Sequence, residues 1–307
     1  MNKTSDHTNG WSLPSIKQLV METYQEWNDD QAPRLGAALA YYTVLSIAPL
    51  LIIVIAIAGF VFGRDAAQGQ IFYQIREMVG SEGASTIEEM IKGASNKESG
   101  VLASLIGFVT LLFGATSVVA ELRYSMNIIW DVPADPQAGL KDVVKERSYA
   151  LAVVLGCGFL LLVSLVVSAG LAAAGKFIEG WLPLPEFVLM AFNFVLAIGV
   201  LTGIFSILFK VLPEVDIHWR DVLLGAAVTA VLFSIGKLVL GLYLGKASFG
   251  STYGTAGSVI IILVWVYYSS QIFFFGAEFT QMYARRHGSD PSRRFREFKR
   301  AETDRLR

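Results

Sequence analysis

The chain has 307 residues, of which 54% are hydrophobic and 17% are charged, and its mean hydropathy is +0.52. Because soluble globular domains carry about 25% charged residues, this composition excludes an ordinary soluble protein and predicts a single membrane domain. The formal net charge of -1 conceals a segregation of charges along the chain, so it excludes no partner by itself.

The first predicted element is an amphipathic helix within residues 1–34. Its apolar and aromatic residues recur at helical spacing, and Ser12 is placed to cap the first turn. We expect this helix to lie on the cytoplasmic surface of the membrane. The residues that form the pattern are Ile16, Leu19, Val20, Tyr24 and Trp27.

Six long apolar stretches follow and predict an all-α, polytopic membrane domain over residues 35–283. Each is long enough to supply the ~20 residues that a helix needs to cross ~30 Å of hydrocarbon. The predicted transmembrane helices are residues 35–63, 100–120, 149–175, 187–209, 222–245 and 257–283.

Two segments outside the spans also carry helical or charged patterns. The connection over about residues 64–99 shows two amphipathic patterns separated by a glycine break at 80–83, which predicts two short interfacial helices capping the outer mouth. The tail over residues 284–307 is basic, which favours contact with anionic lipid headgroups at about 1 kcal/mol per nearby basic residue. It carries no aromatic platform or groove-reading motif, so we expect no nucleic-acid partner.

The distribution of basic residues predicts the orientation of the chain. Six spans place both termini on one side of the membrane, and eighteen of the 25 Lys and Arg residues fall on that side. By the positive-inside rule, this face and both termini are cytoplasmic, and the connection at 64–99 is external.

Polar residues repeat along one face of three spans. The stripe on the second span ends at Glu121, and the stripe on the sixth contains Gln271 and ends at Glu278. Both carboxylates should reach the cytoplasmic boundary, where Arg34 begins the first span and Arg123 ends the second. Two interpretations are open: an ion-pair lock between helix ends, or an entrance that binds a lipid headgroup. The other stripe members are Thr110, Gly114 and Ser117, Tyr267 and Phe274, and Tyr42, Ser46 and Pro49.

Lys237 lies inside the predicted fifth span, about 13 Å from its outer end. Asn193, in the fourth span, is predicted to lie at a similar depth and to be its protein partner. Tyr253 belongs to the glycine-rich segment 248–258 that follows, which forms either a tight connection or a re-entrant turn with a binding role. Lys237 itself either snorkels outward beside small residues or binds phosphate in a hydrophilic cavity.

Four segments resemble a known family. The chain is similar to the YihY/BrkB family of bacterial inner-membrane proteins over about residues 32–286. The resemblance implies six helices in the bacterial plasma (inner) membrane with both termini in the cytoplasm. Its members carry labels as a ribonuclease and as a serum-resistance virulence factor, and some are linked to moving lipids across the envelope. The matching segments are AALAYYTVLSIAPLL (37–51), ELRYSMNIIWDVP (121–133), LPEVDIHWRDVLLGA (212–226) and STYGTAGSVIIILVWVYYSSQIFFFGAEF (251–279).

The residues do not support the ribonuclease label. The three histidines, His7, His218 and His287, are separated from one another, and none forms a recognisable motif with a carboxylate pair, whereas nucleases need clustered ligands or a paired acid and base. The sequence has no phosphate-binding loop, HExxH motif or nucleophile elbow. We therefore expect no enzyme activity, no metal and no cofactor.

Two functions fit these patterns. The first is a transporter or flippase-like component for an amphiphilic envelope molecule such as a lipid, which the polar stripes, Lys237 and the family resemblance favour. The second is a non-catalytic membrane scaffold for envelope assembly, which would bind envelope proteins or form homo-oligomers. A transporter should have a hydrated cavity open to one leaflet, whereas a scaffold should be a fully packed bundle.

Overall fold

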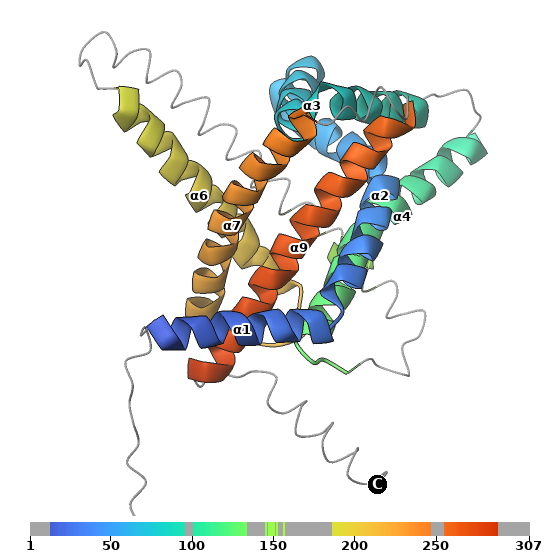
Figure 1. Cartoon of the computed structure of the whole chain (residues 1–307). Helices are drawn as coiled ribbons and strands as arrows, with labels where there is room; N and C mark the ends of the chain where they lie inside the picture. The colour runs from blue at the N-terminus through green and yellow to red at the C-terminus, as the bar shows by residue number, and fades with distance from the viewer. Residues whose placement is uncertain are drawn as a thin grey trace, which may run out of the picture.

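The computed structural model describes residues 13–95, 101–133, 145, 147–150, 152, 156, 186–246 and 255–287. Every regular element in these residues is an α-helix (Figure 1). The predicted third span and the basic tail from residue 288 lie outside the described residues, apart from the few positions between 145 and 156. The helices are α1 (Leu13–Asp29), α2 (Ala32–Phe62), α3 (Arg64–Ser95), α4 (Val101–Ile129), α6 (Glu186–Val211), α7 (Trp219–Lys246) and α9 (Thr255–His287).

Four of these helices contain stretches long and apolar enough to cross a membrane. They lie in α2, α6, α7 and α9, at Ala32–Ile55, Phe194–Val211, Trp219–Gly241 and Val259–Arg286. This confirms the predicted all-helical membrane fold for the described part of the chain. The full set of six spans stays a prediction.

Helix α9 is the central element of the bundle. It packs against α2 on one side and α7 on the other, and α6 packs on α7 while α4 packs on α2 (Figure 1). Aromatic rings fill the contact between α9 and α6: the Phe273 ring centroid lies 5.0 Å from Phe209 and 6.0 Å from Phe205. Two predicted polar stripes meet between α2 and α4, where a Cβ at Gly114 would lie 2.9 Å from Pro49 Cγ.

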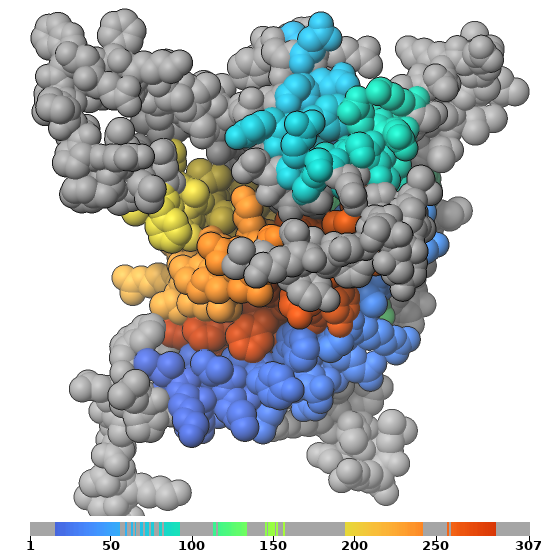
Figure 2. Space-filling view, turned by 45° about the horizontal axis from the view of Figure 1, so that its top comes forward, coloured from blue at the N-terminus to red at the C-terminus, as the bar shows by residue number. Residues whose placement is uncertain are grey.

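Helix α3 covers one end of the bundle (Figures 1 and 2). Its helical conformation is interrupted at Gly80, with φ 80° and ψ 175°, where only glycine is free of steric cost. The break therefore falls where the sequence predicted it. Beyond the break, Ile87 and Ile91 are buried in an apolar cluster with Ile55 of α2 and Ile262 of α9.

Helix α1 lies across the opposite end of the bundle, which we call the α1 end (Figure 1). Leu19 is buried against Phe279 and Met282 of α9, so one face of α1 holds the helix onto the bundle. Other apolar side chains remain exposed on its surface, in keeping with an interfacial helix. They are Ile16, Val20, Met21 and Tyr24.

Candidate functional site

A tight corner between α1 and α2 positions the polar residues of the α1 end. Gln31 adopts the left-handed conformation, with φ 54° and ψ 38°, and Pro33 lies in the first turn of α2, where its fixed φ suits a helix start. The Arg34 backbone N–H donates to the Gln31 carbonyl oxygen at 2.8 Å. The corner thus brings Asp30 at the end of α1 close to Arg34 at the start of α2.

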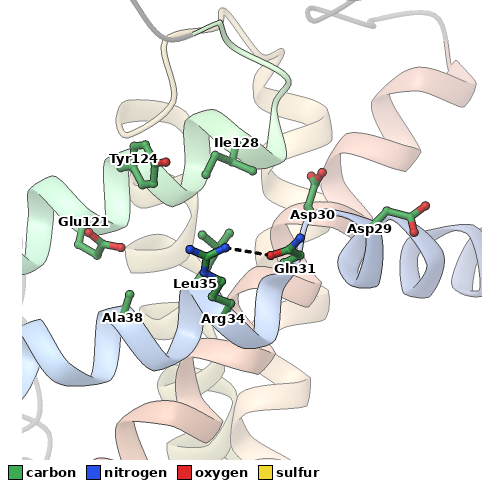
Figure 3. A pocket seen from close by; sticks show the side chains of 9 residues that line it. All are labelled: Asp29, Asp30, Gln31, Arg34, Leu35, Ala38, Glu121, Tyr124 and Ile128. Carbon is green, nitrogen blue, oxygen red and sulfur yellow. Dashed lines mark hydrogen bonds between the residues drawn. The ribbon is translucent and has the colours of Figure 1, made fainter.

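A pocket of about 420 Å³ opens between this corner and α4 (Figure 3). Arg34 on α2 and Glu121 on α4 both line it, as predicted for a shared site at this end of the spans. Among the described residues the two form no ion pair, and Arg34 instead donates to Gln31 Oε1 at 3.3 Å. The lining residues are Asp29, Asp30, Gln31, Arg34, Leu35, Ala38, Glu121, Tyr124 and Ile128.

Arg123 has a different partner from the one expected. Its guanidinium forms a salt bridge with Glu214, in the connection between α6 and α7, and lies 4.6 Å from the Tyr149 ring centroid. The Glu214 backbone N–H also donates to Asn127 Oδ1 at 3.0 Å. Arg123 therefore joins α4 to the α6–α7 connection and does not lock α9.

Glu278 of α9 is fully buried, and its neighbours also differ from those expected. No N–H or hydroxyl group in the described part of the chain donates to either of its carboxylate oxygens. Its carboxyl group instead interacts with that of Asp30, at the corner between α1 and α2. The expectation that Arg34 or Arg123 pairs with Glu278 was wrong, because the turn at Gln31 folds Asp30 over this position and both arginines bond elsewhere.

Arg285, two turns beyond Glu278 on α9, holds the neighbouring acids. Its guanidinium forms salt bridges of 2.7 Å with Glu26 of α1 and of 2.7 Å with Asp131 after α4. Burial raises the pKa of Asp30 to about 6, against a partial lowering by the Glu278 hydrogen bond. The negative charges of Asp131 and Glu26 raise it further, and Arg285 lowers it.

Sequence reasoning missed Asp30, Glu26 and Arg285 because it assigned α1 to the membrane surface and Arg285 to a solvated tail. A signal was present in the spacing of charges. Glu22 and Glu26 are one turn apart on α1, and the adjacent Arg285 and Arg286 end α9. Arg286 pairs with Glu22 at 2.8 Å, so these complementary charges join the two helices.

Ser117, in the predicted stripe of the second span, has a basic partner. Arg147 donates to Ser117 Oγ at 3.3 Å and to Thr116 Oγ1 at 3.2 Å. Its guanidinium also lies 4.9 Å from the Phe113 ring centroid. Arg147 precedes the predicted third span, and its side chain reaches the polar stripe of α4.

The remaining predicted site residues lie apart from the pocket. Lys237 is exposed on α7, beside the exposed side chains of Leu238 and Val239. Gln271 on α9 packs against α2, where a Cβ at Gly36 would lie 2.0 Å from its Nε2 atom. Its amide has no hydrogen-bond partner among the described residues. The side chain of Asn193 and the whole of Tyr253 lie outside the described residues.

Comparison with known proteins identifies the family. The profile of the family described as virulence factor BrkB matches residues 23–301. A UPF0761 membrane protein of Tolumonas auensis is 29% identical, with 83% of this chain and 81% of that protein aligned. One of Alteromonas mediterranea is 27% identical over 87% of this chain and 88% of its own length.

Some relatives are longer than this chain. A UPF0761 membrane protein of Ralstonia nicotianae is 24% identical over 87% of this chain, but the alignment spans 59% of its length. No solved structure matches the chain significantly. The extent of the profile match, with the helical membrane fold, shows that the chain belongs to the virulence factor BrkB family.

Proposed function

We propose that this protein moves an amphiphilic envelope molecule, such as a lipid, and that the pocket at the α1 end receives its polar headgroup. The observation that carries the proposal is the position of this pocket between two long apolar helices, α2 and α4. A fully packed scaffold has no need of a charged cavity there. The predicted orientation places this entrance in the cytoplasmic leaflet.

The lining of the pocket matches an amphiphile that carries both charges. Arg34 presents a guanidinium, which suits a phosphate oxygen pair, and Glu121 presents a carboxylate from the facing helix, which suits an ammonium group (Figure 3). Leu35 and Ile128 supply apolar walls for the first carbons of the acyl region. A zwitterionic headgroup would therefore satisfy two charges that have no ion-pair partner in the described structure.

Lipid movement in proteoliposomes tests this function. The purified protein would be reconstituted with a phosphatidylethanolamine that carries a fluorophore on one acyl chain and keeps its ammonium group, and exchange between leaflets followed by reduction of the accessible fluorophore. We expect the wild-type protein to accelerate exchange and Arg34→Ala and Glu121→Ala to slow it. Arg76→Ala, at an exposed arginine of α3, is the matched control and should behave as wild type. Exchange no faster than in protein-free liposomes would contradict transport and favour the scaffold.

A further inference from the structure

Among the described residues, the carboxyl groups clustered around Arg285 at the α1 end carry more negative charge than this guanidinium neutralises. Four carboxyl groups, those of Glu26, Asp30, Asp131 and Glu278, surround the guanidinium of Arg285. Arg285 donates to two of them, Glu26 and Asp131. Asp30 and Glu278 are left to interact with each other, and α2 and α7 bring no further charged group to this pair among the described residues.

Two ionised carboxylates cannot form a stable contact in a buried place. They repel each other, because both are negatively charged. Asp30 and Glu278 could form a hydrogen bond with each other only if one of them carried a proton. Glu278 is fully buried and receives no other donor in the described structure, so solvent cannot compensate its charge. One shared proton removes one charge and supplies the missing donor.

The pair also has a route to water. Asp30 lines the pocket between the α1–α2 corner and α4 (Figure 3). Glu278 of α9 is not among the lining residues and is fully buried. A proton can therefore reach Asp30 from the pocket without passing through the apolar core. We propose that Asp30 and Glu278 form a proton-binding site that holds one shared proton and exchanges it through this pocket. This proton-binding site does not depend on which molecule the protein transports.

The consequence of proton release follows from the same geometry. Loss of the proton adds a negative charge at the contact between the α1–α2 corner and α9 and at the wall of the pocket that holds Arg34. The charged groups that face the pair are Glu26 on α1, Asp131 after α4 and Arg285 on α9. Because two of these three are acidic, they favour the protonated pair. Burial raises the pKa of Asp30 to about 6, so the ionisation of this carboxyl group falls near neutral pH.

Infrared difference spectroscopy of the purified full-length protein tests the site. The carbonyl stretch of a protonated carboxyl group is separate from that of a carboxylate, so the band can be followed as the pH rises from about 5 to about 8. We expect the wild type to lose one such band in this range. Asp30→Asn and Glu278→Gln should each remove this titration, and Glu89→Gln, a change at an exposed acid of α3 away from the pocket, should retain it.

Melting temperatures of the same samples show whether each variant is folded. A titrating band that persists in folded Asp30→Asn and folded Glu278→Gln would overturn the proposal. A band that disappears when sodium replaces a bulky organic cation at constant pH would also overturn it, in favour of a monovalent cation site.

Discussion

Gly276 of α9 lies against Thr229 of α7 so closely that an added Cβ would be 1.9 Å from the threonine hydroxyl oxygen and 2.9 Å from its Cβ. One turn farther along, the contact is repeated with the roles exchanged, since a Cβ at Gly225 of α7 would lie 1.8 Å from Thr280 Oγ1 of α9. The two helices therefore approach through paired small residues, as is common between membrane helices. Glu278 lies between Gly276 and Thr280 on α9, within this closely packed part of the helix.

Gly276→Ala should destabilise the protein. The new methyl group cannot be accommodated by rotating Thr229 alone, because the Thr229 Cβ itself is too near, so α7 and α9 must separate. Overpacking of this kind costs about 1–3 kcal/mol, which exceeds the gain in helix propensity. Gly241→Ala is the control, since a Cβ there meets nothing within 4 Å. Thermal unfolding in detergent measures both, and equal melting temperatures would contradict the close approach.

Asp30→Asn should stabilise the protein increasingly as the pH rises. The folded-state pKa of Asp30 is about 6, above its ordinary value of 3.8, so its contribution to stability is complete below pH 3.8 and is lost as the pH rises through 6. Asparagine stays neutral and avoids this loss. The difference in melting temperature between variant and wild type should grow between about pH 4 and about pH 6 and then level off. A flat difference for Asp30→Asn would refute the assignment.

Arg285→Ala should be more damaging than a change at an exposed arginine, because the Arg285 side chain is only 18% exposed. Removing the guanidinium leaves Glu26 and Asp131 without their cation and increases the repulsion on Asp30 and Glu278. We expect a loss of about 1.5–3 kcal/mol in the free energy of unfolding, the range for hydrogen bonds to charged groups. Denaturant unfolding in detergent would measure it beside Arg76→Ala. A loss no larger than that of the control would show that the cluster does not hold α1 to α9.

Lys237→Met distinguishes the two interpretations of that lysine. Its exposed position beside Leu238 and Val239 favours snorkelling along the surface of α7, so replacing it by methionine should leave the fold intact and raise stability slightly. Lipid exchange in proteoliposomes should be unchanged. A folded variant that fails in exchange would instead support a phosphate-binding role for Lys237.

The orientation can be tested by chemical labelling. In a background in which Cys157 is replaced by alanine, cysteine would be introduced at Ser81, exposed on α3, or at Asn28, exposed on α1. An impermeant thiol reagent added to intact cells should label Ser81→Cys but leave Asn28→Cys unlabelled until the cells are opened. The opposite result would place the α1 end, with its pocket, outside.

The sequence predicts much of this fold because local rules decide it. Apolar stretches of sufficient length specify the helices, and the glycine near residue 80 specifies the break in α3. The position of Arg34 and Glu121 at one pocket followed from counting helical rise, because α2 and α4 run side by side. Such reasoning succeeds wherever two residues lie on continuous helices.

The partners of Glu278 and Arg123 could not be found in this way, because both depend on non-helical backbone. Asp30 reaches Glu278 through the left-handed turn at Gln31, and Glu214 reaches Arg123 from the connection between α6 and α7. Neither position follows from helix periodicity. Sequence reasoning therefore found the pocket residues on the helices and missed the carboxyl pair behind them.

The site of attachment of a photoreactive lipid tests the central claim most directly. A phosphatidylethanolamine with an intact headgroup and a diazirine near the carboxyl end of one acyl chain would be incorporated with the purified protein, irradiated, and its adducts located by mass spectrometry. We predict adducts on the pocket-lining segments of α2 and α4, around Arg34 and Tyr124, which decrease in Arg34→Ala but not in Arg76→Ala. Adducts spread evenly over the exposed surfaces of α6 and α7, and unchanged in Arg34→Ala, would contradict a headgroup site in the pocket.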